Sequence, residues 1–424
     1  MKSRRMKTAI GLILVIIMVI TVLMAGCSSQ SSTTPTATQP TATTGPTTEA
    51  KTLKVGVVMW LGIGLGTDSK KAYEMEEELI NQSGGLKIGN ETYKIEFIIY
   101  DNSMSATSQQ SAINRLIFED KVKFIISDSF AGDGWLPTAD ENHVLALGSS
   151  PSDYILSPEF HYVFRAYPTN CPAVVMIDWM AREYPEKNKW VYATMDTEGG
   201  HISAEIAQKY LETYNVDCDV EYYPPNASDL SSLGTKIKTV NPDVLIAVGG
   251  GPEKDSLVFK AAYQAGYRGQ FFNTGQSSVM ALSQVIPAEM LEGMIKGEDP
   301  CHLDPIPREI GNEFKDNWVA KYGTWEEPSI IWVLQWYGLK AAFQQAGSID
   351  VDKVTDVFAN GLQFESPQAS CQMVARPDLG NNRTVDSVWD SWITQAVNGE
   401  AVVLDHISLA DGIEIYGRYF QPQQ

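Results

Sequence analysis

This chain of 424 residues has few of the side chains that carry out metal or nucleophilic chemistry. Its histidines are dispersed, with no HExxH pair and no spacing typical of metal ligands. There is no GxSxG nucleophile elbow and no phosphate-binding Walker loop. We therefore expect a protein that is not an enzyme and that uses no metal and no cofactor. The five histidines are His143, His161, His201, His302 and His406.

Basic side chains are also scarce, because 32 Lys and Arg stand against 52 Asp and Glu, for a formal net charge of -20. A surface this acidic repels nucleic-acid backbones and anionic lipid headgroups. We therefore expect no nucleic-acid partner. The length exceeds what one small hydrophobic core organises, so two domains are expected.

Residues 1–27 have the features of a bacterial export signal. A basic start is followed by the apolar run Ala9–Met24, which is short for a membrane span and contains one weakly polar residue, Thr21. Small residues then precede Cys27, which resembles a lipoprotein signal whose cysteine is lipidated and becomes the mature N-terminus. The alternative is an uncleaved N-terminal anchor. Either way we expect an exported chain that is tethered to the cell membrane. The basic residues are Lys2, Arg4, Arg5 and Lys7.

Residues 28–52 are rich in Ser, Thr and Pro and almost free of large apolar side chains. Such a segment cannot bury enough surface to offset the entropy of ordering it. It is predicted to be a tether, with a reach of roughly 80 Å when fully extended.

From Leu53 onward, apolar strand patterns alternate with helical patterns. Strands separated by helices predict parallel sheets with right-handed crossovers. In open sheets of this kind, ligands bind beyond the carboxyl ends of the strands, where loops lead into helices. The loops that follow strands are therefore the places to search for a binding site.

The stretch Val122–Trp135 is the first candidate for a ligand-binding loop. It begins as a buried strand and breaks into small, turn-forming residues. It then leads to a helix-like run, Trp135–Glu141, which Asp133 is placed to cap. A second group of small hydroxyl residues, Gly148–Ser152, follows the next strand. The alternative for both is an ordinary strand–loop–helix connection.

Several segments occur in the order and spacing of one known family. They are L-K-V-G-V-V-M from residue 53, I-E-F-I-I-Y-D-N from 95, V-K-F-I-I-S from 122, V-L-A-L-G-S-S from 144 and Y-V-F-R-A-Y-P from 162. The similarity continues through W-V-Y-A-T-M-D and I-K-T-V-N-P-D-V-L-I and covers nearly all of residues 53–424. The chain thus resembles the leucine/isoleucine/valine-binding family of ABC-transporter substrate-binding proteins.

The resemblance implies the type I fold of periplasmic binding proteins, an α/β fold with two doubly wound parallel-sheet lobes joined by a multi-strand hinge. The first lobe would comprise residues 53–167 and roughly 299–366, and the second residues 168–298 and roughly 367–424. The implied function is a monomeric extracytoplasmic receptor for a small polar organic solute. It would capture this solute in a cleft between the lobes and deliver it to the permease and ATPase subunits of an ABC importer.

The family's site residues can be carried over by position in the first lobe. Ala131 and Gly132 would offer main-chain N–H groups to a ligand carboxylate, while Ser150 and Ser152 occupy the places of residues that contact the carboxylate and the ammonium. Short hydroxyls and N–H groups at a helix start can satisfy an anion without a full counter-charge. The alternative for the two serines is a turn or a helix cap. Aromatic residues near the cleft, Trp60 and Trp135 among them, could stack on a ligand or simply pack.

The second-lobe half of the family's site is altered here. The family's tyrosine becomes Gly251, an aromatic side chain is replaced by Gly199 or Gly200, and the acid that pairs with the ligand ammonium falls at Gly275 or Gln276. A buried ammonium without an anion is costly. Either another acid substitutes or the ligand lacks an α-ammonium. The candidate acids are Asp128, Asp133 and Asp153.

Four cysteines remain after Cys27, and in an exported protein an even number permits two disulfides. The family layout favours the pairs Cys301–Cys371 and Cys171–Cys218. The alternative is four buried thiols, which apolar packing tolerates.

Two other functions stay open at this point. One is a sensory module of the same fold that reports ligand to a receptor, and the other is a secreted hydrolase with a non-standard site. The solute also stays open among amino acids, amides or urea-like compounds, and aromatic or aliphatic carboxylates.

Overall fold

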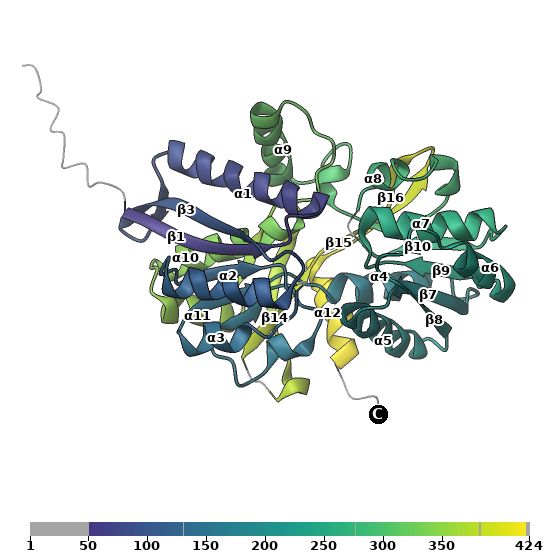
Figure 1. Ribbon diagram of the computed structural model, residues 1–424, viewed down its shortest axis with the longest axis horizontal. Coiled ribbons are helices and arrows are strands. Elements are labelled where there is room, and N and C mark those ends of the chain that lie inside the picture. The colour runs from purple at the N-terminus through teal and green to yellow at the C-terminus, as the bar shows by residue number, and fades with distance from the viewer. Residues whose placement is uncertain (1–50, 130, 276, 381–382, 421–424) are drawn as a thin grey trace, which may run out of the picture. The chain divides into compact units, whose positions relative to one another are not determined.

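The computed structural model describes residues 51–129, 131–275, 277–380 and 383–420. These residues form a nine-stranded and a seven-stranded sheet with helices between the strands, so the predicted α/β class with two parallel-dominated sheets is confirmed (Figure 1). The predicted signal and its Cys27, nearly all of the tether, and Gln276 lie outside the described residues.

The first sheet has the strand order β12-β13-β14-β6-β5-β4-β1-β3-β2. Its centre is parallel, with Gly56 of β1 opposite Ile125 of β4 and Val55 opposite Phe97 of β3. The strands are β1 (Lys51–Met59), β2 (Leu86–Ile88), β3 (Glu91–Asp101), β4 (Phe124–Ser127), β5 (Leu145–Gly148), β6 (Val163–Arg165), β12 (Gln363–Glu365), β13 (Ser370–Ala375) and β14 (Thr384–Trp389).

Both faces of this sheet are covered, because alternate strand residues belong to different hydrophobic clusters. Val57 of β1 clusters with side chains of α1 and α10, whereas Val58 clusters with side chains of α2 and α3. Strands buried on both faces read as continuous apolar runs, which is why their positions were predictable from the sequence. The helices packed on this sheet are α1 (Gly64–Gln82), α2 (Ala106–Phe118), α3 (Leu136–Glu141), α10 (Leu334–Ala346) and α11 (Val351–Ala359), with α9 (Glu309–Tyr322) against α1.

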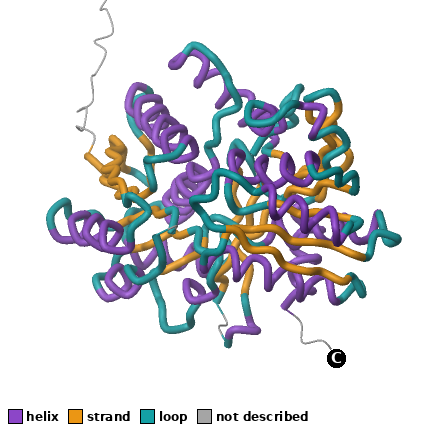
Figure 2. The backbone as a smooth tube through the Cα atoms, turned by 45° about the vertical axis from the view of Figure 1, so that its right-hand side comes forward, coloured by secondary structure: helices purple, strands orange, loops and turns teal. Residues whose placement is uncertain are grey.

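The second sheet has the strand order β16-β15-β11-β10-β9-β7-β8 and also has helices on both faces (Figure 2). Val191 of β7 clusters with α6 and α7, while the neighbouring Tyr192 clusters with α4 and α5. The strands are β7 (Lys189–Met195), β8 (Asp217–Tyr223), β9 (Val244–Ala247), β10 (Gln270–Asn273), β11 (Ile295–Glu298), β15 (Ser391–Val397) and β16 (Glu400–Ile407). The helices of this sheet are α4 (Cys171–Glu183), α5 (Glu198–Glu212), α6 (Ser231–Val240), α7 (Gly251–Gln264) and α8 (Val279–Ser283), and α12 (Leu409–Phe420) packs on α4.

The chain passes between the sheets three times, and the third passage differs from the expected one. We expected it near residue 367, where the last segment of the second lobe was expected to begin. Instead β12 and β13 form an antiparallel pair, β14 joins them in the first sheet, and the chain crosses between Trp389 and Ser391. Residues 370–389 therefore belong to the first sheet. Buried Cys371 and Met373 alternate with more exposed neighbours in β13, as expected for a strand with one face in the core.

No helix in the described ranges combines the length and apolar character that crossing a membrane requires. Helix α12 packs on α4 and also on β13 and β14, so the end of the described chain contacts elements of both sheets.

Candidate functional site

The loops that follow β1, β3 and β4 are joined by one buried carboxylate. Asp128 comes directly after β4, and its Oδ2 accepts a hydrogen bond from the backbone N–H of Trp60 at 2.7 Å. Its Oδ1 accepts from the Asn102 side chain at 2.8 Å. Asp128 thus fixes the place where Trp60 leaves the sheet, and both of its oxygens are occupied.

A second carboxylate on the same edge, that of Asp133, is only half satisfied. The Ser150 hydroxyl donates to Asp133 Oδ2 at 2.5 Å, which joins the loop after β4 to the loop after β5. The other oxygen, Oδ1, is buried and has no hydrogen-bond partner in the part of the chain that the structure describes. Burial raises the pKa of Asp133 to about 6, against the opposing effects of Ser150 and Arg165, and the charge of Glu198 raises it further. Asp133 therefore remains largely ionised at neutral pH and presents an unused acceptor.

The expectation that Asp133 caps the helix after β4 is wrong. Helix α3 begins after Trp135 without a side-chain cap, and Asp133 contributes only its backbone oxygen, to Leu136 N–H at 3.1 Å. The Asp133 carboxylate instead accepts a hydrogen bond from Ser150, and this bond places Asp133 in the site.

Three of the four small residues that we expected at the ligand's carboxylate or ammonium already make hydrogen bonds within the protein. The N–H of Gly132 donates to Ser129 O at 3.1 Å, in a turn that gives Gly132 a φ of 100°. The Ser150 hydroxyl is committed to Asp133, and its oxygen accepts from Ser152 N–H at 3.1 Å. The Ser152 oxygen accepts from Tyr154 N–H at 3.2 Å and caps a short 3-10 helix.

Sequence reasoning missed the residue that holds this second loop. Arg165, at the end of β6, is fully buried and donates through Nη1 to the backbone oxygens of Ser150, Pro151 and Ser152 at 3.2, 3.4 and 3.4 Å. Its charge is balanced by a two-pronged ion pair with Asp386, at 2.9 and 2.7 Å. A charged residue inside the apolar strand V-F-R was the signal that could have identified it.

The second sheet approaches this site through the start of α5. Glu198 occupies the first turn of α5 and is close enough for its charge to raise the pKa of Asp133. A Cβ on the next residue, Gly199, would lie 3.7 Å from Pro151. A Cβ on Gly200 would lie 2.1 Å from the Met195 oxygen, so a side chain is excluded there. Gly199 thus brings the start of α5 close to the loop after β5, and Gly200 lets α5 pack closely on the end of β7.

Gly251 and Gly275, the remaining predicted positions that the structure describes, lie farther along the edge of the second sheet. Gly251 is exposed at the first position of α7 with a φ of 68°. Beneath Gly275 lies the buried carboxylate of Asp255, 3.8 Å from where a Gly275 Cβ would stand. Burial raises the pKa of Asp255 to about 7, although Gly250 N–H and the Asn273 amide both donate to it.

The structure distinguishes the three acids that could replace the family's missing carboxylate. Asp128 is occupied by Trp60 and Asn102. Asp153 is paired with Arg165 at 3.1 Å and with Arg376 at 2.9 Å. Of the three, Asp133 alone has an oxygen without a partner among the described residues.

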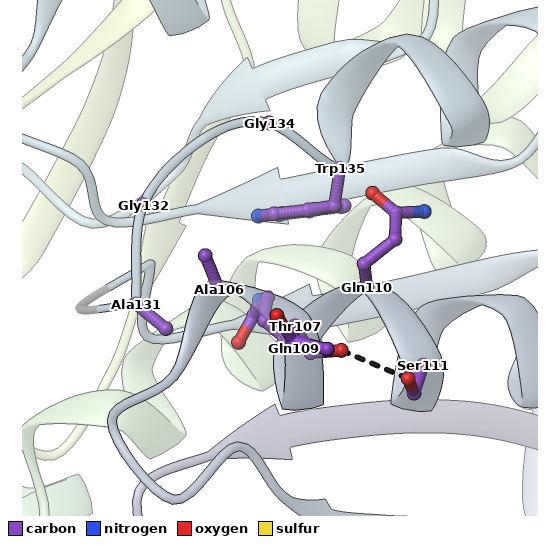
Figure 3. Close-up of a pocket in the computed structure, with 9 residues that line it drawn as sticks. All are labelled: Ala106, Thr107, Gln109, Gln110, Ser111, Ala131, Gly132, Gly134 and Trp135. Atoms are coloured by element: carbon purple, nitrogen blue, oxygen red, sulfur yellow. Dashed lines mark hydrogen bonds between the residues drawn. The ribbon is translucent and has the colours of Figure 1, made fainter.

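Three predicted ligand residues line a single cavity beside the loop. Trp135 is buried, and its ring forms one wall of a cavity of about 410 Å³ that Ala131 and Gly132 also line (Figure 3). Trp60 is only partly buried, and its ring nitrogen lies against Gly62. Within the described segments, no group of three or more His, Cys, Asp or Glu is arranged to hold a metal ion.

The expected disulfides are not formed. Cys171, Cys218, Cys301 and Cys371 are free thiols in the structure, and three of them are buried. Cys301 Sγ instead contacts the Pro367 oxygen at 3.2 Å. Burial raises the pKa of all four thiols, so they act as small apolar side chains.

Two parallel-dominated sheets joined by three crossings define the class of solute-binding proteins with a type I fold. Residues 61–397 match the periplasmic binding protein family, and the chain belongs to that family. The leucine-binding protein LivK of Thermotoga maritima has a similar structure, with 17% identity, a TM-score of 0.68, and coverage of 85% of this chain and 99% of that one.

Two solute-binding proteins of ABC transporters from Rhodopseudomonas palustris are similar to the same degree. The structure with benzoate has 19% identity and a TM-score of 0.67, and covers 84% of this chain and 96% of its own. The structure with 3,4-dihydroxybenzoic acid, from strain BisB5, has 17% identity and a TM-score of 0.68, with coverage of 84% and 98%. At these identities the likeness concerns the fold.

Proposed function

We propose that this protein is the lipid-anchored, extracytoplasmic solute receptor of an ABC importer, and that its solute presents a hydrogen-bond donor, preferably an ammonium group, to Asp133. Family membership supports the transport role. The basic start, the apolar run and the small residues before Cys27 support export and anchoring through that cysteine. The solute would lie between the carboxyl edges of the two sheets, as ligands do in open α/β folds.

The free oxygen of Asp133 is the observation that carries the proposed solute class. The donors expected for a carboxylate, at Gly132 and Ser150, are already engaged, whereas a buried acceptor remains open. A buried polar atom without a partner is unfavourable, and a ligand N–H group placed there would remove that cost.

Local charge favours the same class of solute. Asp133 and Glu198 come from the two sheets and bring negative charge together. The nearby cation Arg165 is balanced by Asp386 and Asp153. An ammonium group would be attracted here and a carboxylate repelled. Amino acids, amides and urea-like compounds can offer N–H groups to Asp133, and a simple aromatic or aliphatic carboxylate cannot.

Calorimetry with a panel of amino acids, amides, amines and simple carboxylates tests the proposal. We expect the tightest ligand to carry an ammonium or amide N–H group. Its affinity should fall as the pH is lowered through 6, because protonation of Asp133 removes the negative charge. Asp133→Asn should weaken binding roughly 10- to 100-fold at pH 7.5, since a desolvated charged hydrogen bond becomes a neutral one.

Asp316→Asn is the matched control, because it makes the same chemical change on the exposed surface of α9. It should leave binding unchanged. Tight binding of a carboxylate that has no N–H group, with no response to pH or to Asp133→Asn, would show that the proposed solute class is wrong.

A further inference from the structure

The cavity beside the loop that carries Asp133 has its own set of lining residues. It lies between the first turns of α2 and the segment 131–135, and its volume is about 410 Å³. Neither Asp133, Ser150 nor Ser152 lines it, so it is distinct from the proposed solute site although both use the same loop. The lining residues are Ala106, Thr107, Gln109, Gln110, Ser111, Ala131, Gly132, Gly134 and Trp135.

Two buried side chains in this wall each have one polar atom without a protein partner. Trp135 and Gln109 are both 1% exposed. The indole N–H of Trp135 and the amide oxygen of Gln109 have no hydrogen-bond partner anywhere in the described chain. Figure 3 shows the indole lying across the space above α2, with its nitrogen toward Gly132. The wall therefore offers one unused donor and one unused acceptor.

The Gln109 amide has its other contact in the loop after β4. Its nitrogen donates to the Ser127 hydroxyl oxygen at 2.7 Å. The same oxygen also accepts from Ser129 N–H at 3.1 Å. In this arrangement the Gln109 carbonyl oxygen is the end of the amide without a partner among the described residues.

The chemistry of the lining selects a neutral ligand. None of the nine lining residues is charged, so an anion or a cation would lose its hydration without gaining a counter-charge. The indole face, Ala106 and Ala131 provide apolar surface for a flat group. The amino-terminal end of α2 also forms part of the wall, and its dipole favours the negative end of a ligand dipole, such as a carbonyl oxygen.

We propose that this cavity is a second binding site, for a small planar molecule that carries a neutral carboxamide. The ligand carbonyl accepts from the Trp135 N–H, and the ligand NH₂ group donates to the Gln109 oxygen. Both atoms that lack partners are then satisfied by a single functional group, and the planar body lies against the indole. The site goes beyond the proposed transport solute, because it needs neither Asp133 nor its charge.

Benzamide is the probe, and calorimetry on the full chain in detergent is the measurement. We expect benzamide to bind, and benzoate and toluene to bind at least tenfold more weakly, since one is charged and the other has no hydrogen-bonding group. Trp135→Phe keeps an aromatic ring and removes only the N–H, and should weaken benzamide roughly 3- to 10-fold. Gln109→Leu should have an effect of similar size.

Two further variants separate this site from the Asp133 site. Ala106→Leu projects a larger side chain into the cavity and should abolish benzamide binding while retaining binding of the transport solute. Asp133→Asn should retain benzamide binding. The proposal is overturned if benzamide does not bind, if it binds equally to the wild type, Trp135→Phe and Ala106→Leu, or if Asp133→Asn abolishes its binding. Failure of the Asp133 solute proposal leaves these outcomes unaffected.

Discussion

A single carboxylate, that of Asp133, combines the two properties that a binding residue needs. It is placed firmly by Ser150, and it keeps one acceptor unused. Its burial has an energetic cost in the absence of ligand, because the ionised form is favoured in water. Residues that reduce stability in this way are common at functional sites.

The energetic cost of burying Asp133 can be measured through the pH dependence of the free energy of unfolding. The pKa of Asp133 is raised to about 6 in the folded protein, whereas an unfolded Asp titrates near 4. Between about pH 4 and 6 the folded state retains a proton that the unfolded state releases, so this contribution to stability falls as the pH rises and is fully lost above 6. Asp133→Asn cannot ionise and should therefore be more stable than the unliganded wild type above pH 6.

Urea unfolding at pH 7.5 and at pH 4.5 checks this prediction. The advantage of Asp133→Asn should be largest at pH 7.5 and smaller at pH 4.5, with Asp316→Asn showing no such trend. A variant that is less stable than the wild type by the same amount at both pH values would mean that Asp133 holds the loop rather than straining it.

For single residues, the sequence predicts which residue types follow the strands. It does not predict which of these acids keeps an oxygen without a hydrogen-bond partner. Asp128, Asp133 and Asp153 all follow strands and are equivalent by position. Which of these carboxylates is already paired depends on residues that are far away in the sequence. Arg376, which pairs with Asp153, is 223 residues farther along the chain. Such pairing depends on the folded structure and has no local signal in the sequence.

Among the elements, buried parallel strands were the easiest to predict. Strands such as β4 and β5 are covered on both faces, so every residue is apolar or small and the run is continuous. The antiparallel strands after residue 362 were harder. β13 alternates between buried and partly exposed positions, and β16 exposes Val402, Val403 and Leu404, so apolar content alone does not locate these strands.

The first turn of α1, which begins at Gly64, contains two glycines with different surroundings. Gly66 lies so close to the Trp60 oxygen that a Cβ there would stand 1.8 Å from it. A Cβ on Gly64 would meet nothing within 4 Å. The two glycines therefore have different roles within a single helical turn.

Replacing each glycine with alanine should separate these roles. Gly66→Ala should lower the free energy of unfolding by about 1–3 kcal/mol, because the loop that carries Trp60 must move away from α1. Gly64→Ala should change it by no more than about 1 kcal/mol, and in the stabilising direction, since alanine is the better helix former. Chemical denaturation of the two variants side by side gives the comparison, and equal losses would contradict the close-contact explanation.

Across the whole molecule, one buried ionic network joins segments that are far apart in the sequence. Asp386 of β14 accepts from Arg165 of β6, from Arg376 at 3.2 Å and from the Tyr416 hydroxyl of α12 at 2.9 Å. The same Arg165 holds the backbone of the Ser150 loop. The position of a proposed ligand loop therefore depends on β14 and α12, which lie more than 200 residues farther along the chain.

Removal of one charge from this network should lower the free energy of unfolding substantially. Burial alone would raise the pKa of Asp386, but Arg165, Arg376 and Tyr416 more than offset this effect and keep the pKa below its usual value. Within the described ranges, Asp386→Asn leaves the fully buried Arg165 with the half-exposed Asp153 as its one remaining ionic partner. Breaking a buried ion pair in this way costs about 3–5 kcal/mol. We expect a loss of that size in urea unfolding at pH 7.

Asp378→Asn is the matched control, because Asp378 is partly exposed and Arg376 is its one ion-pair partner among the described residues, so its loss should cost far less. The depressed pKa of Asp386 also fixes the direction of the pH effect. The contribution of Asp386 to the free energy of unfolding is complete above its unfolded-state pKa near 4. It is lost as the pH falls through the lower pKa that Asp386 has in the folded protein. The gap between wild type and Asp386→Asn should therefore persist from pH 7 to pH 5 and narrow only in stronger acid. A gap that closed already near pH 6 would mean that the network does not keep the pKa of Asp386 below its usual value.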